Sequence, residues 1–151
     1  KSDFVGLNYY ANLILSVFMK REPPFEPHAR PGQVLTDMPY AIYAEGFYRA
    51  LMRLKPLNKP IIVTENGIAD DRDDRRALWI ERYTYAMSCA IADGVDVRGY
   101  HYWSLIDNFE WAEGWQMSFG LYANDRSTQQ RQLRDGALAY RDIVAQWSDY
   151  E

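Results

Sequence analysis

Cysteine is almost absent from this 151-residue chain, in which Cys89 is the single example. One cysteine excludes a disulfide within the chain and a thiolate metal site made by the chain alone. Because free cysteine is among the most often buried residue types, we interpret Cys89 as a small hydrophobe on a predicted helix. A chain without disulfides fits a reducing compartment, and we expect a cytoplasmic location.

Long apolar runs and clusters of basic residues are also missing. No run approaches the ~18 apolar residues of a membrane-spanning helix, and no signal-peptide pattern opens the chain. The formal net charge is −4, and the Lys and Arg residues are scattered, whereas phosphate binding favours clustered ones. We therefore expect neither a membrane nor a nucleic acid as a partner.

Glycine-rich phosphate loops are absent as well. Neither Gly-x-Gly-x-x-Gly nor Gly-Lys-Ser/Thr follows any predicted strand, so a nucleotide-binding doubly wound fold lacks its characteristic motif. What the chain does contain is 48% hydrophobic residues, which is enough for a folded core, and 15% aromatic residues. Aromatic side chains serve as core, as interface or as a platform for sugars, so their placement has to decide among these roles.

Apolar stretches alternate with amphipathic ones along the chain. The patterns predict strands at 4–9, 60–64 and 97–103, helices at 40–54 and 133–147, and a third helix with acidic N-terminal residues at 70–74 and its end at 93–94. Between them we expect a long loop at 11–39, a short extended piece at 119–122 and a polar turn at 123–131. Residues 60–64 suit a strand covered on both faces. Repeated strand–helix units predict an α/β fold with a parallel sheet and right-handed crossovers.

A polar or charged residue stands at the C-terminal end of each predicted strand, where a (β/α)₈ barrel places its chemistry. Three strand–helix units are too few for a barrel, and three strands alone would leave two apolar open edges. We therefore expect five further strands from an N-terminal segment outside this chain, from a partner chain or from a second copy.

Glu65 directly follows the second predicted strand. On spacing alone, a glutamate that caps a turn or pairs with a surface lysine is the favoured interpretation. However, residues 62–67, Ile-Val-Thr-Glu-Asn-Gly, resemble the (I/V)-T-E-N-G signature of the family 1 glycoside hydrolases, the β-glucosidase family. Residues 3–10 resemble that family's sixth strand, residues 99–115 its eighth strand and following loop, and residues 119–122 the piece beyond.

This resemblance implies a fold and a domain assignment. Residues 1–151 would be the C-terminal part of a single catalytic domain, namely the last three βα units (strands 6 to 8) of a (β/α)₈ TIM barrel. The N-terminal part of that barrel would then lie outside this chain.

The resemblance also implies retaining hydrolysis of β-glycosides by two carboxylates about 5–5.5 Å apart. Glu65 matches the nucleophile, which forms a glycosyl–enzyme ester and must be ionised, so hydrogen-bond donors should surround it. Tyr10 matches a tyrosine whose hydroxyl donates to that carboxylate, and its alternative role is a core tyrosine at a strand end.

Five further residues match positions that bind the sugar: Asn8, Trp103, Glu110, Trp111 and Phe119. Trp103 would face the pyranose, Glu110 and Trp111 would bind its O3, O4 and O6 hydroxyls, and Phe119 would close the pocket near O6. A carboxylate at 110 would repel a phosphate, so the resemblance is to the branch that acts on non-phosphorylated sugars. The alternatives are a turn former for Asn8, core packing for Trp103 and a solvated loop carboxylate for Glu110.

No metal and no cofactor are expected. His101 lies two residues before Trp103 and on the same face of the strand, so it could line the barrel interior, but core packing is its favoured role. No second ligand stands at metal-ligand spacing from it. Glu113 is expected at the rim of the site or in solvent.

The second catalytic carboxylate is missing. In the family it lies on the fourth strand in a T-x-N-E-P context, and Asn-Glu-Pro does not occur here. The expected partners are therefore a β-glycoside or oligosaccharide substrate and a complementary N-terminal barrel segment that brings the acid/base glutamate. The alternative is a non-catalytic half-barrel or carbohydrate-binding unit, including a piece made to assemble with others.

Overall fold

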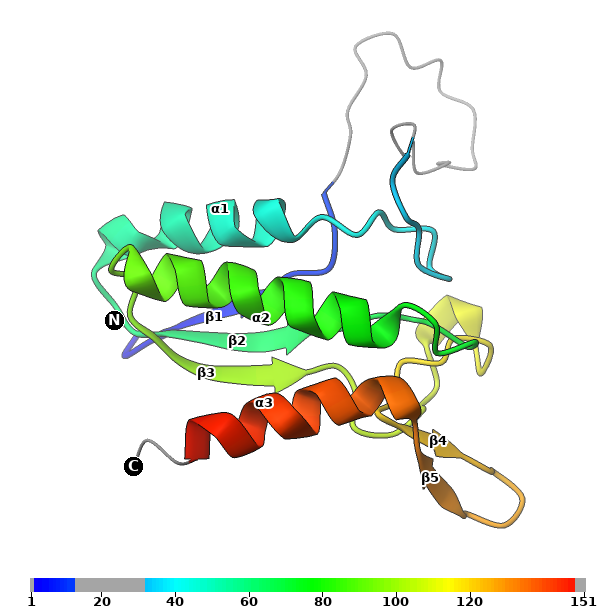
Figure 1. The fold of residues 1–151 in the computed structure, drawn as a ribbon. Helices are drawn as coiled ribbons and strands as arrows, with labels where there is room; N and C mark the ends of the chain where they lie inside the picture. Colours follow the sequence, from blue (N-terminus) through cyan, green and yellow to red (C-terminus); the bar gives the residue numbers. More distant parts are fainter. Residues whose placement is uncertain (1, 13–31, 149–151) are drawn as a thin grey trace, which may run out of the picture.

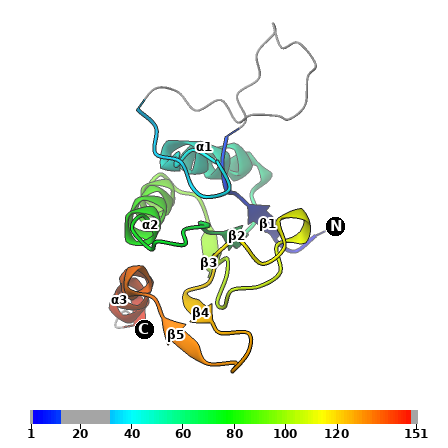
Figure 2. The ribbon, with the colours of Figure 1, turned by 90° about the vertical axis from the view of Figure 1, so that its right-hand side faces the viewer.

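A three-stranded parallel sheet organises the computed structural model, which describes residues 2–12 and 32–148. Strands β1 (Val5–Asn8), β2 (Ile61–Asn66) and β3 (Val97–Tyr102) lie in the order β1-β2-β3. Helices α1 (Ala44–Leu54), α2 (Arg76–Ala92) and α3 (Leu138–Ser148) lie on one side of this sheet (Figure 1). Figure 2 looks onto the C-terminal ends of the strands and shows the same one-sided arrangement. The predicted succession of strand and helix is confirmed.

Only one face of the sheet is covered within the described part of the chain. Ile61 and Val63 of β2 point towards the helices and are 1% and 0% exposed. Their neighbours Ile62 and Thr64 point the other way, and Thr64 is exposed. The prediction that residues 60–64 are covered on both faces is therefore wrong for these residues, because all three helices pack on the same face.

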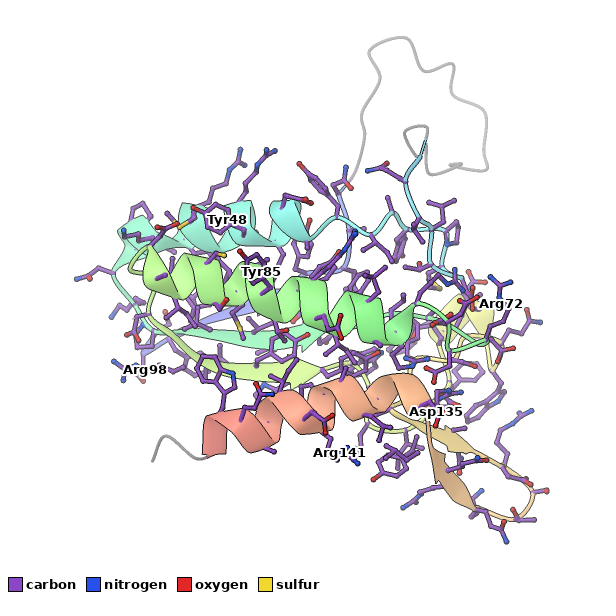
Figure 3. The ribbon with its side chains drawn as sticks, in the orientation of Figure 1. Tyr48, Arg72, Tyr85, Arg98, Asp135 and Arg141 are labelled. Carbon is purple, nitrogen blue, oxygen red and sulfur yellow. The ribbon has the colours of Figure 1, made fainter. Side chains whose placement is uncertain are left out.

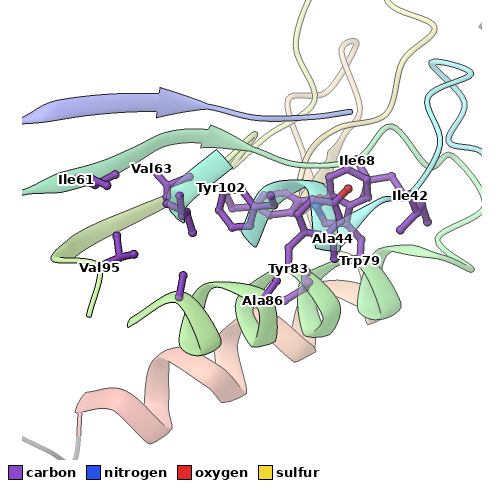
Figure 4. Packing of buried hydrophobic residues seen from close by; sticks show 14 of the residues in the cluster. Ile42, Ala44, Ile61, Val63, Ile68, Trp79, Tyr83, Ala86, Val95 and Tyr102 are labelled. Carbon is purple, nitrogen blue, oxygen red and sulfur yellow. The ribbon is translucent and has the colours of Figure 1, made fainter. Parts of the chain in front are cut away.

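The aromatic residues of the helices form much of the core. Trp79 and Tyr83 of α2 stack with ring centroids 3.9 Å apart, and Phe47 of α1 packs against Tyr83 at 5.7 Å. Figure 4 shows the α2 side chains in the layer between this helix and the sheet. Tyr85 of α2 and Arg141 of α3 lie on the exposed sides of their helices (Figure 3). Cys89 is half-buried, so it is less enclosed than expected.

Helix α1 begins at Ala44, whereas the sequence pattern predicts a start at 40. The residues before it run alongside 34–36, since the Thr36 amide donates to Tyr40 O and the Ile42 amide donates to Val34 O. The helix ends at Leu54, as predicted, and passes into a 3₁₀ turn, η1 (Lys55–Leu57), that contains Pro56.

The expected polar turn at 123–131 contains most of a β-hairpin. Strand β4 (Tyr122–Asn124) pairs antiparallel with β5 (Arg131–Leu133). A 3₁₀ turn, η3 (Asp135–Ala137), follows, so the last helix begins at Leu138 and the predicted start at 133 is wrong. Backbone pairing of residues 131–133 takes precedence over their weak helical pattern.

None of the helices in the described ranges is both long and apolar enough to span a membrane.

Leu51 tests the packing between α1 and the sheet. It is 0% exposed in the core, so Leu51→Ala should lower the free energy of unfolding by ~2–5 kcal/mol through lost burial and a residual cavity. Urea unfolding followed by circular dichroism measures this change. Leu57→Ala removes the same atoms from a side chain that is 55% exposed and should change the free energy by less than ~1 kcal/mol. Equal losses in the two variants would contradict the assigned core.

Candidate functional site

The C-terminal ends of the three strands meet at one edge of the sheet. Asn8 and Glu65 are register partners across β1 and β2. The Tyr9 amide donates to Glu65 O at 3.0 Å, and the Trp103 amide donates to Asn66 O at 2.9 Å. These bonds continue the sheet beyond the strands and bring the polar residues that follow them together.

Asn66 joins these strand ends through its side chain. It is 0% exposed, its Nδ2 donates to Tyr9 O at 2.5 Å, and its Oδ1 accepts from the Tyr100 hydroxyl at 2.7 Å. This role of Asn66 was not predicted from the sequence. The sequence did offer one signal, a polar residue at the end of a buried strand, because a buried polar group needs hydrogen-bond partners.

Gly67 lies where the backbone after β2 approaches the backbone after β3. A Cβ at this position would stand 1.7 Å from the Trp103 carbonyl oxygen, which no side chain can occupy. The glycine of the Thr-Glu-Asn-Gly stretch therefore allows a close approach between two backbones, a standard reason for glycine beside a site.

The half-buried Glu65 carboxylate accepts a hydrogen bond from the Tyr10 hydroxyl, with Oη and Oε2 2.8 Å apart. Burial raises the pKa of Tyr10 far above its ordinary value, and the hydrogen bond to Glu65 and the charges of Glu65 and Glu110 raise it further. The tyrosine consequently keeps its proton at physiological pH and remains a donor to the carboxylate.

Glu110 shares this space. Burial and repulsion from Glu65 and Glu113 raise its pKa, while a hydrogen bond from the Trp103 side chain lowers it. Phe119 is 4% exposed and packs edge-on against Tyr10, with ring centroids 6.2 Å apart. The structure thus gathers five of the seven candidate residues into one group: Tyr10, Glu65, Trp103, Glu110 and Phe119.

Two candidates lie at the margin of this group. The exposed Asn8 accepts from Thr64 Oγ1 at 2.5 Å. Trp111 is 83% exposed in the 3₁₀ turn η2 (Trp111–Glu113), whose last residue Glu113 is also exposed. His101 is exposed as well, with Nδ1 3.2 Å from Val63 O, so the prediction that it packs in the core is wrong. Its face of β3 is the one that the helices leave open.

Within residues 2–12 and 32–148, no group of three or more His, Cys, Asp or Glu side chains is arranged to hold a metal ion.

Comparison with known proteins identifies the chain's relatives. The model of glycosyl hydrolase family 1 matches residues 1–148. This chain belongs to glycoside hydrolase family 1. A β-galactosidase from Pyrococcus woesei is 33% identical over 95% of the chain, and β-glucosidase A from Thermotoga maritima is 36% identical over 95%.

Solved structures of family 1 agree with this relationship. A Thermotoga maritima β-glucosidase in complex with methoxycarbonyl-substituted glucoimidazole is 34% identical and covers 96% of the chain with a TM-score of 0.83. The match takes up 35% of that structure, and 32% and 34% of the two relatives above. These neighbours are (β/α)₈ barrels, so the chain has the fold of a part of such a barrel and spans about a third of the length of the curated relatives it matches.

Substitution of Gly67 tests the close approach between the backbone after β2 and the backbone after β3. Gly67→Ala forces the Trp103 carbonyl to move and should destabilise the fold by about 1–3 kcal/mol, seen as a lower melting temperature in calorimetry. Gly6→Ala is the matched control, because its Cβ would meet Thr64 Cγ2 at an ordinary 3.4 Å. A Gly67 variant no less stable than the Gly6 variant would contradict the described contact.

Substitution of Glu110 tests the electrostatics of the five candidate residues that lie together. Because its pKa is raised in the folded state, the folded chain holds this proton more tightly than the unfolded chain, and stability falls as pH rises through the titration. Glu110→Gln should therefore raise the melting temperature at neutral pH, and the gain should vanish below the ordinary pKa of 4.5. Thermal unfolding at several pH values measures the difference. A gain that persists unchanged in acid would show that charge is not its cause.

Proposed function

We propose that this chain carries the nucleophile of a retaining β-glycosidase that acts on non-phosphorylated sugars, with Glu65 as the attacking carboxylate. The observation that carries the proposal is the hydrogen bond from Tyr10 to Glu65 at the C-terminal ends of two neighbouring parallel strands. Membership of family 1 and relatives named β-glucosidase and β-galactosidase support the same activity.

The proposed first step forms an ester. Glu65 attacks the anomeric carbon, the bond to the aglycone oxygen breaks, and an acid/base glutamate from outside this chain protonates the leaving oxygen. Water, deprotonated by the same glutamate, then cleaves the ester and releases the sugar. Tyr10 holds the Glu65 carboxylate in place through its hydroxyl.

The remaining residues surround the sugar in this proposal. Trp103 offers an aromatic face, while Glu110, Trp111 and Asn8 supply hydrogen-bonding groups for hydroxyls. Phe119 closes the pocket behind Tyr10. The negative charges of Glu110 and Glu65, close enough to interact, disfavour a phosphorylated substrate.

We further propose that β1, β2 and β3 are strands 6 to 8 of the barrel, that residues 1–151 are the C-terminal part of its single domain, and that a complementary N-terminal segment completes it. Strands β1 and β3 are both edge strands here, and the open sheet face carries Ile62. A groove of about 420 Å³ between α2, β3 and α3 is lined by apolar side chains that include Met87, Val97 and Trp147, and Trp147 is 56% exposed. Such apolar surface favours a covering segment.

A mechanism-based label tests the nucleophile. With the complementary segment present, a 2-deoxy-2-fluoro glycoside with a good leaving group should add one fluoroglycosyl unit to the peptide that contains Glu65, detected by mass spectrometry after digestion. Glu65→Gln should abolish both label and turnover while the circular dichroism spectrum stays unchanged. Glu113→Gln, on the exposed turn η2, is the control and should be labelled. A label on another carboxylate would overturn the assignment.

Turnover of an ordinary β-glycoside separates the enzyme from a non-catalytic unit. This chain without its complement should show turnover lower by ~10²–10⁴-fold or more, because the general acid is missing. Full activity from the 151-residue chain alone would contradict the need for an outside glutamate.

A further inference from the structure

Arg76, at the first position of α2, is a fully buried arginine that joins two loops beside the site. Its guanidinium donates to four backbone carbonyls, two after β2 and two after β3, at 2.7–3.2 Å: Ile68, Asp70, Ser118 and Phe119. Nε donates to Asp73 Oδ1 at 2.7 Å, and Nη1 donates to the Tyr102 hydroxyl at 2.8 Å. A buried charge is tolerated only when it is paired and hydrogen-bonded in this way.

These contacts connect Arg76, through two further residues, to the candidate nucleophile Glu65. Arg76 holds the backbone of Phe119, whose ring packs edge-on against Tyr10, and Tyr10 donates to Glu65. On the other side, Arg76 holds the carbonyl of Ile68, three residues after Glu65. The two loops also bond to each other, since the Asp70 amide donates to Ser118 O at 3.1 Å. One side chain therefore sets the spacing between the backbone that carries the carboxylate and the backbone that carries the aromatic wall.

We propose that Arg76 is a positioning residue for the glycosylation step, an inference that rests on the proposed function of Glu65. It touches neither Glu65 nor the space in front of it in the described contacts and acts by holding Phe119, and through it Tyr10, against the carboxylate. The planar fork of arginine reaches both loops at once, whereas the single ammonium of lysine cannot. Misplacement of a reacting group by about 1 Å costs on the order of 10²-fold in rate.

Arg75 supplies a matched control. It is the preceding residue, its side chain is 14% exposed, and it also bonds to Asp70. Its other partners are the adjacent Asp74, and Asp37 and Leu35 O in the segment before α1. None of its described contacts reaches the loop after β3. Arg75 pairs with three carboxylates and Arg76 with one, so the same substitution disturbs more ion pairs at 75. Only the substitution at 76 should change the spacing of the two loops.

The test compares Arg76→Lys with Arg75→Lys in the chain together with its complementary segment, at a temperature where both variants are folded by circular dichroism. The readout is the rate constant for labelling by a saturating 2-deoxy-2-fluoro glycoside, which reports attack on the anomeric carbon alone. Arg76→Lys should slow labelling by about 10–100-fold and Arg75→Lys by less than about 3-fold. Equal rates for Arg76→Lys and the unsubstituted protein, or equal slowing by both variants, would overturn the proposal.

Hydrogen exchange tests the same inference without a labelling reaction. The amides of Asp70, bonded to Ser118 O, and of Ser104, bonded to Phe119 O, should lose protection in Arg76→Lys but not in Arg75→Lys, while amides of α2 stay protected in both. Retained protection at 70 and 104 would reject the role of Arg76. If the unsubstituted protein takes no label yet these amides respond as expected, the assignment of Glu65 and the role of Arg76 in glycosylation both fail, while the hold of Arg76 on the two loops stands.

A milder substitution keeps the proposal testable if Arg76→Lys fails to fold. Tyr102→Phe removes one acceptor of Arg76 and leaves the carbonyl contacts in place, so it should slow labelling in the same direction by a smaller factor. An unchanged labelling rate together with unchanged protection at 70 and 104 would count against the proposal.

Discussion

The buried amide of Asn66 is the constraint on which the strand ends depend. It donates to the backbone after β1 and accepts from a tyrosine on β3, so one side chain of the central strand fixes both neighbours. An unsatisfied buried amide costs ~1–3 kcal/mol, which gives this register a definite energetic preference. Glu65 immediately precedes Asn66, and Gly67 immediately follows it. The hydrogen bonds of Asn66 therefore position both the Glu65 carboxylate and the close backbone approach at Gly67.

The same region shows a conflict between stability and function. Two carboxylates, Glu65 and Glu110, face one partly buried space, and burial together with repulsion from Glu65 raises the pKa of Glu110. A core built only for stability would not hold two like charges together. Tyr10 offsets part of this cost as a protonated donor to Glu65, and the Trp103 side chain does so for Glu110. Groups of this kind are typical of sites that must bind a polar ligand.

Much of the fold and of the site was predictable from sequence, for identifiable reasons. Apolar β-branched residues at 61–63 predict β2, and the three- and four-residue spacing of Ala44, Phe47 and Leu51 predicts α1, because burial of a continuous face dominates both elements. The β4–β5 hairpin was not predictable, since its pairing depends on backbone bonds between residues of no marked pattern. Arg76 was equally hidden: a buried arginine looks like a surface residue until the carbonyls that surround it are known. Long-range polar contacts are therefore where pattern reasoning failed.

In the proposed mechanism, two catalytic tasks fall to different parts of the barrel. The contacts described around Glu65 come from Asn66, Gly67 and Tyr10, and behind Tyr10 from Phe119 and Arg76. In our proposal, these contacts within the three βα units hold the Glu65 carboxylate in place before the substrate binds. Protonation of the leaving oxygen, by contrast, needs a carboxylate on the opposite side of the glycosidic bond, which in our proposal another segment supplies. The barrel fold suits this separation, because each strand end is held mainly by its two neighbours and by the helices behind them.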